Sequence, residues 1–600
     1  MQMLKNIFLS FIATLLFPIY TSVKTLSFSN TFFSIIYFVL IVLLFNYSDK
    51  QNYEKRMKKY TYGLGFLFST MTACGYSLDN LETVPYRNIY LVIAIIMYSK
   101  IFGVLLCEVW IFLEKYEAFL SQKNSQKKIW KKIYQICDVI MKYPIIISIF
   151  LLVCWSPCYI SVFPGNFIYD ATAEFNQIEN GFSGNFPMLH SVLITQILSL
   201  AYQLTGSYNV GIAMYTILQM LILSFMFSHI IYKFSQHHVN KLLLSLLILY
   251  YGIFPVIHIL VTSTVRDILF SGLLTYTAFL FWLMISEKEV FVHSILRPAF
   301  LGIMLTLTLL ARNNNASIVM IVILFLLSIF VWIWARQGER KGAVIFTIVT
   351  VSSYFMLSYV LAILCQPYQP ANISSSLSIL TQPIIRAYLS DENNFTQEEE
   401  IELRKFFKGD LVYLSKDGDA TKFQLIEMDE NNKFFDFFRL WVKIGIKNRA
   451  AYMDGILANT EQMWFPNSVI NGYKQASTPY DSYDKCYFAL WGEIEEPGVQ
   501  SHFLPNIYEF YKNIGLMISF EKIPIISMLF SIGFQFWILL NCCFYAIYRK
   551  CRTQWVSLAI ILGYSLISAC VPLILLRYFA ALFFSFPLVL VFTLQPESTR

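Results

Sequence analysis

Long apolar stretches alternate with short polar connections along the whole chain. A transmembrane helix needs about 20 consecutive, mostly apolar residues, and about fourteen stretches meet that requirement. They lie near residues 6–23, 29–47, 61–77, 89–112, 143–162, 209–231, 242–262, 268–286, 298–314, 316–335, 343–364, 525–547, 555–574 and 577–595. The pattern therefore predicts an all-α polytopic membrane protein with about fourteen transmembrane helices.

The composition agrees with a membrane protein and excludes other classes. Hydrophobic residues make up 57% of the chain and charged residues only 14%, against roughly 25% charged residues in soluble domains. The net charge of +7 comes from Lys and Arg in short connections, which is typical of membrane edges and not of a nucleic-acid surface. The 11 cysteines are scattered without a C-x-x-C pair, so we expect no zinc or redox site.

The basic connections predict the orientation. They lie at residues 50–59, 115–132, 233–241, 287–297, 336–341 and 549–552. Because Lys and Arg favour cytoplasmic loops, we place all six connections and both termini in the cytoplasm of a multi-pass cell-membrane protein. The connection at 163–208 and the long insert at 365–524 then share the outer face.

One run, His190 to Leu204, is apolar enough to be a span. Counting it as one would reverse every later connection and place the basic ones outside. Its regularly placed polar residues suit an interfacial helix. We therefore expect this run to lie on, or dip into, the outer leaflet.

The pattern divides the chain into four regions. They are an N-terminal four-span region (1–142), a membrane core with the outward loop 163–208 (143–364), an extracytoplasmic domain (365–524) and a C-terminal three-span region (525–600). The extracytoplasmic domain is rich in acidic residues and is expected to be mainly helical. Within it, Thr396 followed by Glu399 is typical of a helix start. A second helix is predicted at 434–458, with Phe438, Trp441, Val442 and Ile446 on one apolar face.

Polar residues gather at the predicted outer ends of the spans. They are Asp170, Glu174, Gln177 and His190 in the first outward loop, Arg266 and Asp267, Arg312 and Asn313, and Arg577 and Tyr578. Carboxylates beside a membrane are costly unless they face water or a partner, so this group is a candidate active site. The alternative is a solvated loop, with arginines that reach lipid headgroups or pair with a neighbouring acid.

These residue types suit the binding of a phosphate and the transfer of a proton. Arg presents a planar fork of donors to phosphate oxygens, and an Asp such as Asp170 can accept a proton from an attacking hydroxyl. His190 is a candidate second proton carrier or phosphate donor. The adjacency of Asp267 favours a structural pair with Arg266, whereas Arg312 and Arg577 have no adjacent acid. We expect Arg266, Arg312 and Arg577 to share one phosphate, with Arg312 and Arg577 as the stronger candidates. Glu174, Gln177, Asp267, Asn313 and Tyr578 are expected as further substrate contacts.

Several segments, taken in order, resemble a group of bacterial polytopic membrane proteins that are similar to the GT-C class of glycosyltransferases. The segments are FPGNFIYD, FPMLH, TVRDILFS, ARNNNAS and RYFAALFFSFP. The GT-C class includes protein mannosyltransferases and aminoarabinose transferases. The resemblance implies a sugar donor linked to polyprenyl phosphate, and a catalytic base or metal contact at an Asp in the first outward loop, which Asp170 matches.

The chain departs from the resembled pattern in three places. Phe186 stands where the pattern has a His, Arg266 replaces a Lys, and residues 410–422 lack the usual signature. Because the missing His weakens a metal site, we expect no cofactor, although the resemblance leaves a divalent metal open.

The combined prediction is a membrane glycosyltransferase of the cell envelope. It would transfer sugar from a polyprenyl-phosphate donor to a glycan, lipid or protein acceptor on the outer face, with Asp170 and His190 as catalytic residues. Membrane lipid is an expected partner and nucleic acid is not. The alternative function is a transporter or flippase of lipid-linked sugars, and a third is a non-catalytic scaffold whose outer domain binds a partner.

Overall fold

The computed structural model describes most of the chain. The described residues are 1–22, 31–121, 141–168, 170–312, 331–333, 340–369, 377–391, 394–416, 418, 421, 424–426, 434–468, 494–501, 503–515, 523, 526–571 and 573–594. The structural statements that follow concern these residues.

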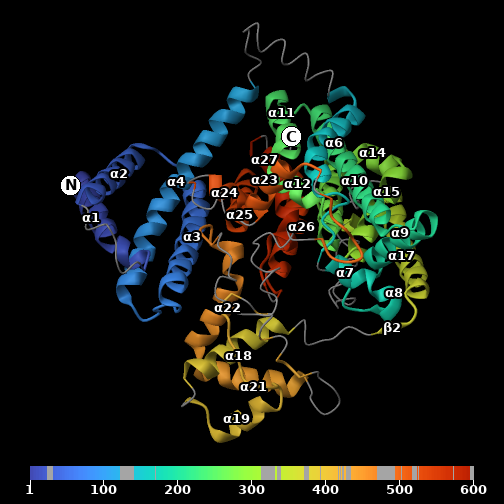
Figure 1. Cartoon of the computed structure of the whole chain (residues 1–600). Helices are drawn as coiled ribbons and strands as arrows, with labels where there is room; N and C mark the ends of the chain where they lie inside the picture. Colours follow the sequence, from blue (N-terminus) through green and yellow to red (C-terminus); the bar gives the residue numbers. More distant parts are fainter. Residues whose placement is uncertain are drawn as a thin grey trace.

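Helices dominate every described region of the chain (Figure 1). The N-terminal region contains α1 (Gln2–Tyr20), α2 (Thr31–Lys50), α3 (Lys55–Leu81) and α4 (Ile89–Ser121). The membrane core contains α6 (Pro144–Ser161), α7 (Asp170–Phe175), α8 (Gln177–Asn180), α9 (Met188–Thr205), α10 (Tyr208–Gln236), α11 (Lys241–Ile253), α12 (Pro255–Val261), α13 (Arg266–Ser286), α14 (Lys288–His293), α15 (Leu296–Leu310) and α17 (Lys341–Leu364). The insert contains α18 (Ser378–Ser390), α19 (Gln397–Arg404), α21 (Phe434–Lys447), α22 (Arg449–Trp464) and α23 (Pro505–Gly515). The last region contains α24 (Ile526–Phe530), α25 (Ile532–Arg549), η5 (Arg552–Gln554), α26 (Trp555–Ser568), η6 (Leu576–Phe579) and α27 (Ala580–Leu594).

Eight helices in the described part of the chain are long and apolar enough to cross a membrane. A ninth span is possible if α11 and α12, which meet at a bend of 55°, form one broken span. The spans predicted at 61–77, 298–314, 525–547 and 555–574 correspond to α3, α15, α25 and α26, which are shorter or more polar. The span predicted at 316–335 lies mainly outside the described residues. The fold is that of an all-α, multi-pass membrane protein.

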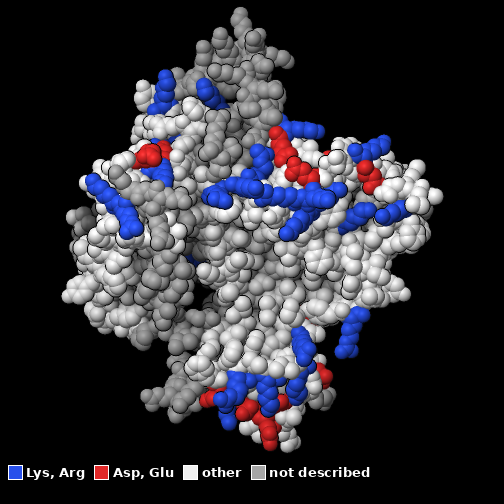
Figure 2. Space-filling model, turned by 180° about the vertical axis from the view of Figure 1, so that it is seen from behind, with Lys and Arg blue, Asp and Glu red and all other residues white. Residues whose placement is uncertain are grey.

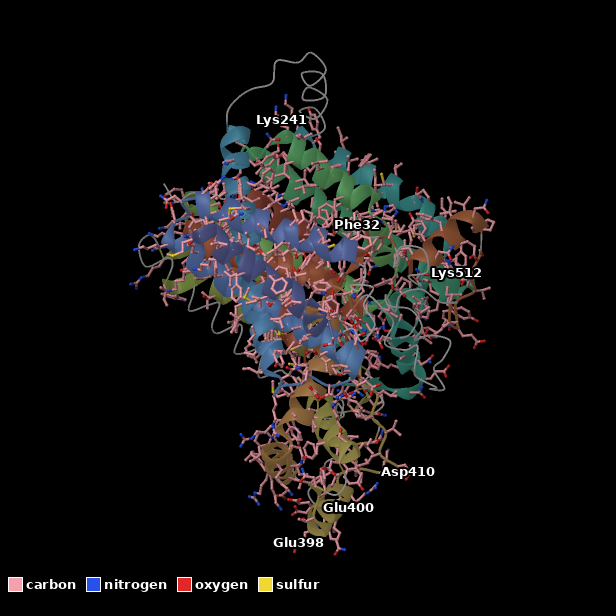
Figure 3. The ribbon with its side chains drawn as sticks, turned by 90° about the vertical axis from the view of Figure 1, so that its left-hand side faces the viewer. Phe32, Lys241, Glu398, Glu400, Asp410 and Lys512 are labelled. Carbon is pink, nitrogen blue, oxygen red and sulfur yellow. The ribbon has the colours of Figure 1, made fainter. Side chains whose placement is uncertain are left out.

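Charged side chains gather at two ends of the molecule and leave an uncharged belt between them (Figure 2). Figure 3 places Lys241 at one end and Glu398 at the other. The Tyr548 hydroxyl lies 3.3 Å from Glu54 Oε2 and 3.1 Å from Glu114 Oε1. These contacts bring together three of the basic connections along the chain, as expected if they face the same side of a membrane.

Helices α18, α19, α21 and α22 of the insert form a small helical domain at the opposite end, at the bottom of Figure 1. Helix α23 instead packs against α6 and α12 of the membrane core. In the small domain, helix α19 begins as predicted, because Thr396 accepts a hydrogen bond from the Glu399 N–H and Glu399 accepts one from the Thr396 N–H. The domain core is built mainly from residues of α18, of α21 and of the segment that follows α19, which contributes Phe406, Phe407 and Leu411.

Two details of the predicted second helix are wrong. The helix breaks at Asn448 into α21 and α22, and α21 buries Phe437, Leu440 and Ile444 in place of the predicted face. Phe438, Val442 and Ile446 are exposed. Because α21 is apolar over most of its circumference, periodicity alone could not identify the face that packs against the core.

Buried polar contacts fasten this domain to the turn between α3 and α4. Asp454 on α22 accepts hydrogen bonds from the Thr83 hydroxyl (2.5 Å), the Val84 N–H (3.1 Å) and the Tyr86 hydroxyl (2.8 Å). The Phe465 ring packs so closely on Gly75 that a Cβ there would lie 2.4 Å from it. Glycine at this position therefore allows the domain and α3 to approach each other.

The first outward loop lies at the same end as the insert. Strand β1 (Phe182–Ser183) pairs with β2 (Tyr368–Gln369), and the Glu495 N–H donates to the Phe167 carbonyl over 2.9 Å. The run predicted to be interfacial forms α9, which is not among the eight candidate spans. It packs closely on the start of α10, where a Cβ at Gly211 would lie 2.7 Å from the Leu198 Cα.

Candidate functional site

Asp170 reaches the candidate site because the loop before it is tied to the loop before α13. The backbone of Asn166 exchanges hydrogen bonds with Thr262 and Thr264, over 3.0 and 3.1 Å. These bonds align the two loops side by side. Since Asp170 and Arg266 each begin a helix shortly after the paired residues, the pairing places the two side chains together.

Two arginines converge on one oxygen of Asp170. Arg266 Nη2 lies 3.3 Å and Arg577 Nη1 lies 3.2 Å from Asp170 Oδ2. Arg577 comes from η6, far along the chain from both partners. The Asp170 side chain is 23% exposed and that of Arg266 is 19% exposed. We call Asp170, Arg266 and Arg577 the open cluster.

Glu174 extends the open cluster into the protein interior. Its Oε2 accepts a hydrogen bond from the Ser191 hydroxyl over 2.9 Å and lies 2.8 Å from His190 Nδ1. The other ring nitrogen of His190 lies 2.7 Å from the Tyr215 hydroxyl. Because both nitrogens are engaged and the residue is buried, His190 holds Glu174 in place and does not face a ligand. The predicted role of His190 as a proton carrier is therefore corrected to a positioning role.

Arg266 keeps part of its hydrogen-bonding capacity unused. Its Nη1 is buried and has no hydrogen-bond partner among the described residues, and the same holds for Glu174 Oε1, which lies 3.9 Å away. The guanidinium carbon also lies 5.0 Å from the centre of the Phe186 ring, within the range of a cation–π interaction. Phe186 and Arg266, two of the departures from the resembled pattern, thus contact each other.

Arg312 belongs to a second cluster that is almost sealed from solvent. Its Nη1 lies 2.8 Å from Asp267 Oδ1 and donates to the Tyr564 hydroxyl over 2.6 Å. The side chains of Arg312 and Asp267 are 8% and 1% exposed. We call Asp267, Arg312 and Tyr564 the closed cluster. The expected pair of Arg266 with Asp267 is wrong, because Asp267 pairs with Arg312.

Tyr578 links the two clusters. The guanidinium carbons of Arg312 and Arg577 lie 5.7 and 4.8 Å from the centre of its ring, and its hydroxyl accepts a hydrogen bond from Arg577 over 2.9 Å. Arg312 and Arg577 are therefore neighbours, as the sequence predicts. Arg577 contacts the partly exposed Asp170, whereas Arg312 contacts the buried Asp267, so we reassign Arg312 from phosphate binding to structure.

Two further predicted residues, Gln177 and Asn313, and the predicted absence of a metal remain to be compared with the structure. Gln177 is buried and accepts a hydrogen bond from the Ser183 N–H over 2.8 Å, so it shapes the loop and is not placed to contact a substrate. Asn313 lies outside the described residues. In the described part of the chain, no group of three or more His, Cys, Asp or Glu residues is arranged to hold a metal ion. Metal independence stays a prediction.

Sequence reasoning missed Tyr215 and Tyr564 as members of this network. Each lies in a mainly apolar helix that carries other hydroxyl groups, and aromatic residues make up 17% of the chain. Their hydroxyls could have been singled out only with knowledge of which helices pack together.

The family comparison covers most of the chain. Residues 181–600 match the family of unknown function DUF6020. His190, Arg266, Arg312 and Arg577 lie inside this stretch, while Asp170 and Glu174 precede it. No curated protein and no solved structure matches the chain. The chain belongs to the DUF6020 family.

Proposed function

We propose that this protein is a membrane glycosyltransferase that uses a sugar donor linked to polyprenyl phosphate. The observation that carries the proposal is the open cluster, in which two guanidinium groups meet a partly exposed carboxylate at one end of a helical membrane region. Arginine forks suit phosphate oxygens, and a carboxylate can accept the proton of an attacking hydroxyl. The resemblance to the GT-C class adds the substrate class to this chemistry.

In the proposed reaction, an acceptor hydroxyl attacks the anomeric carbon of the donor sugar. A new glycosidic C–O bond forms and the C–O bond to the phosphate breaks. Asp170 takes the hydroxyl proton, and Arg266 and Arg577 stabilise the negative charge of the departing phosphate. The acceptor is a glycan, lipid or protein of the cell envelope.

The neighbouring residues hold Arg266 and Arg577 in position. Glu174 stabilises Arg266, with which it makes an ion pair of 3.9 Å, and His190 and Ser191 hold Glu174. The closed cluster joins α13 to α26 beneath Tyr578, and so stabilises the turn that carries Arg577. On the proposed orientation this end of the molecule is extracytoplasmic, and both termini are cytoplasmic.

One observation favours the alternative of a transporter or flippase for lipid-linked sugars. Transporters often use discontinuous membrane helices, and α11 and α12 meet at a 55° bend. Movement of an uncleaved, fluorescent lipid-linked sugar from one leaflet of a vesicle membrane to the other, dependent on the purified protein, would support this alternative.

The proposed activity can be tested with full-length protein in lipid nanodiscs. Incubation with hexoses linked to decaprenyl phosphate and a cell-envelope acceptor extract should release decaprenyl phosphate. Asp170→Asn should slow the release about 100-fold or more, the usual effect of losing a general base. Glu179→Gln, which removes an exposed carboxylate from the same loop, is the control and should react normally. Near-normal release by Asp170→Asn would remove Asp170 from the mechanism.

A further inference from the structure

We propose that Asp170 is an internal placeholder that occupies the phosphate site of Arg266 and Arg577 until a phosphate-bearing ligand displaces it. The inference rests on the proposed function, which assigns the two arginines to phosphate, and adds how the site is controlled. In the structure the carboxylate of Asp170 stands where a phosphate oxygen would bind.

The geometry of the contact between Asp170 and the two arginines suits exchange of the carboxylate for another anion. Both arginines approach the same Asp170 oxygen, at 3.2 and 3.3 Å. The corresponding contact in the closed cluster is shorter, at 2.8 Å. Asp170 is also the most exposed member of either ion pair, so a rotation of its side chain would move it toward solvent.

The charges lead to the same conclusion. Asp170 and Glu174 balance Arg266 and Arg577, and Asp267 balances Arg312. A phosphate that entered beside Asp170 would add a negative charge to a balanced group, and like charges brought together cost several kcal/mol. A phosphodiester that replaces the carboxylate on the arginines restores the balance with one negative charge for another.

Displacement would also activate the base. Two guanidinium groups favour the ionised form of a carboxylate and so weaken it as a proton acceptor. A carboxylate that has rotated off both arginines toward solvent holds a proton more readily than one held between them. Asp170 would therefore become an effective base only when the donor is bound.

Arg266 has the unused donor that the exchange needs. Its buried Nη1 lies 3.9 Å from Glu174 Oε1, too far for a hydrogen bond, and has no hydrogen-bond partner among the described residues. A phosphate has more acceptor oxygens than a carboxylate, so it can use Nη1 as well as the Nη2 that Asp170 occupies. This extra bond would favour phosphate over the placeholder.

Binding measurements on the full chain in phosphatidylcholine nanodiscs test the placeholder. The probes are inorganic pyrophosphate and decaprenyl phosphate, each titrated by calorimetry. Asp170→Asn and Asp170→Ala should bind at least about tenfold more tightly than the wild type, because a competing like charge is gone. Glu179→Gln, the control, should bind like the wild type. Adding Arg577→Gln to Asp170→Ala should remove the gain.

Each outcome decides the question. Tighter binding of both probes, or of decaprenyl phosphate alone, supports the placeholder, and the comparison tells whether a free or a membrane-bound phosphate is preferred. Unchanged or weaker binding by both Asp170 variants, with thermal unfolding like that of the wild type, overturns it, as does the absence of binding by every variant.

The same experiment separates this inference from the proposed function. Tighter binding without sugar transfer by the wild type would keep the placeholder and reject the glycosyltransferase. Transfer that is lost in Asp170→Asn without any gain in binding would keep the glycosyltransferase and reject the placeholder.

Discussion

The open and closed clusters contain the same types of charged group, yet their surroundings differ. In the closed cluster, Arg312 is enclosed by the rings of Phe270, Tyr564 and Tyr578, at 5.4, 5.4 and 5.7 Å from their centres. In the open cluster, Asp170 is reached by two arginines at longer distances and remains partly exposed.

The difference shows how a membrane protein can use one kind of ion pair for two purposes. A buried pair with short contacts is costly to break, because either partner alone would be an unpaired charge in a medium of low dielectric. A partly solvated pair with longer contacts is easier to open, because water can replace the missing partner. The closed cluster therefore suits a structural joint, and the open cluster suits a site that exchanges ligands.

Removing an arginine from each cluster should give the largest contrast. Arg312→Gln leaves Asp267 buried without its cation and should cost about 3–5 kcal/mol of stability. Arg577→Gln should cost less, because Asp170 keeps Arg266 and contact with solvent. Thermal unfolding of both variants in detergent micelles measures the difference. Equal losses would erase the distinction between the clusters.

His190 offers the next largest effect and tests its corrected role. His190→Gln leaves Glu174 or Tyr215 without a buried partner, which should cost about 1–3 kcal/mol of stability. Pyrophosphate binding should change little, since His190 does not touch either arginine of the open cluster among the described contacts. A variant that unfolds like the wild type but no longer transfers sugar would restore the chemical role predicted from the sequence.

Arg577→Lys should have a smaller effect that is specific to ligand binding. Lysine keeps the charge but loses the planar fork, so affinity for pyrophosphate should fall about tenfold, as expected for one charge-assisted hydrogen bond. Arg312→Lys is the matched comparison and should lower the temperature of unfolding without weakening pyrophosphate binding. A loss of affinity in both variants would mean that both arginines bind the ligand.

The smallest effect should come from a cluster remote from both. Burial alone would raise the pKa of Glu399, but hydrogen bonds from Lys447, from the Thr396 N–H and from Lys443 outweigh burial and lower the pKa from its ordinary 4.5 to about 2. The lowered pKa means that the ionised form stabilises the folded domain above about pH 4.5, and that this contribution is lost as the pH falls toward about 2.

Unfolding of the full chain across this pH range measures that contribution. Glu399→Gln keeps an acceptor for the Thr396 N–H but loses the ion pairs with Lys443 and Lys447. It should cost about 1 kcal/mol of stability near neutral pH, as expected for partly exposed ion pairs. The difference from the wild type should shrink as the pH falls from about 4.5 to about 2. Pyrophosphate binding should be unaffected, and a change in it would show that the outer domain is coupled to the open cluster.

Local patterns in the sequence were enough for several features of the fold. The apolar stretches predicted a helical membrane protein, and the Thr396 and Glu399 pair predicted the start of α19, because both depend on residues close together in the chain. The buried face of α21 could not be predicted in the same way, since either of its apolar faces could have packed against the core.

The candidate site shows the same division. The sequence by itself determined which charged residues stand at the ends of apolar helices, because the cost of burying charge limits where such residues can occur. Only the tertiary structure decided which of them pair. The adjacency of Arg266 and Asp267 suggested one partner, but successive residues on a helix point in different directions. Arg266 therefore meets Asp170 and Asp267 meets Arg312, through contacts that depend on how distant helices pack together.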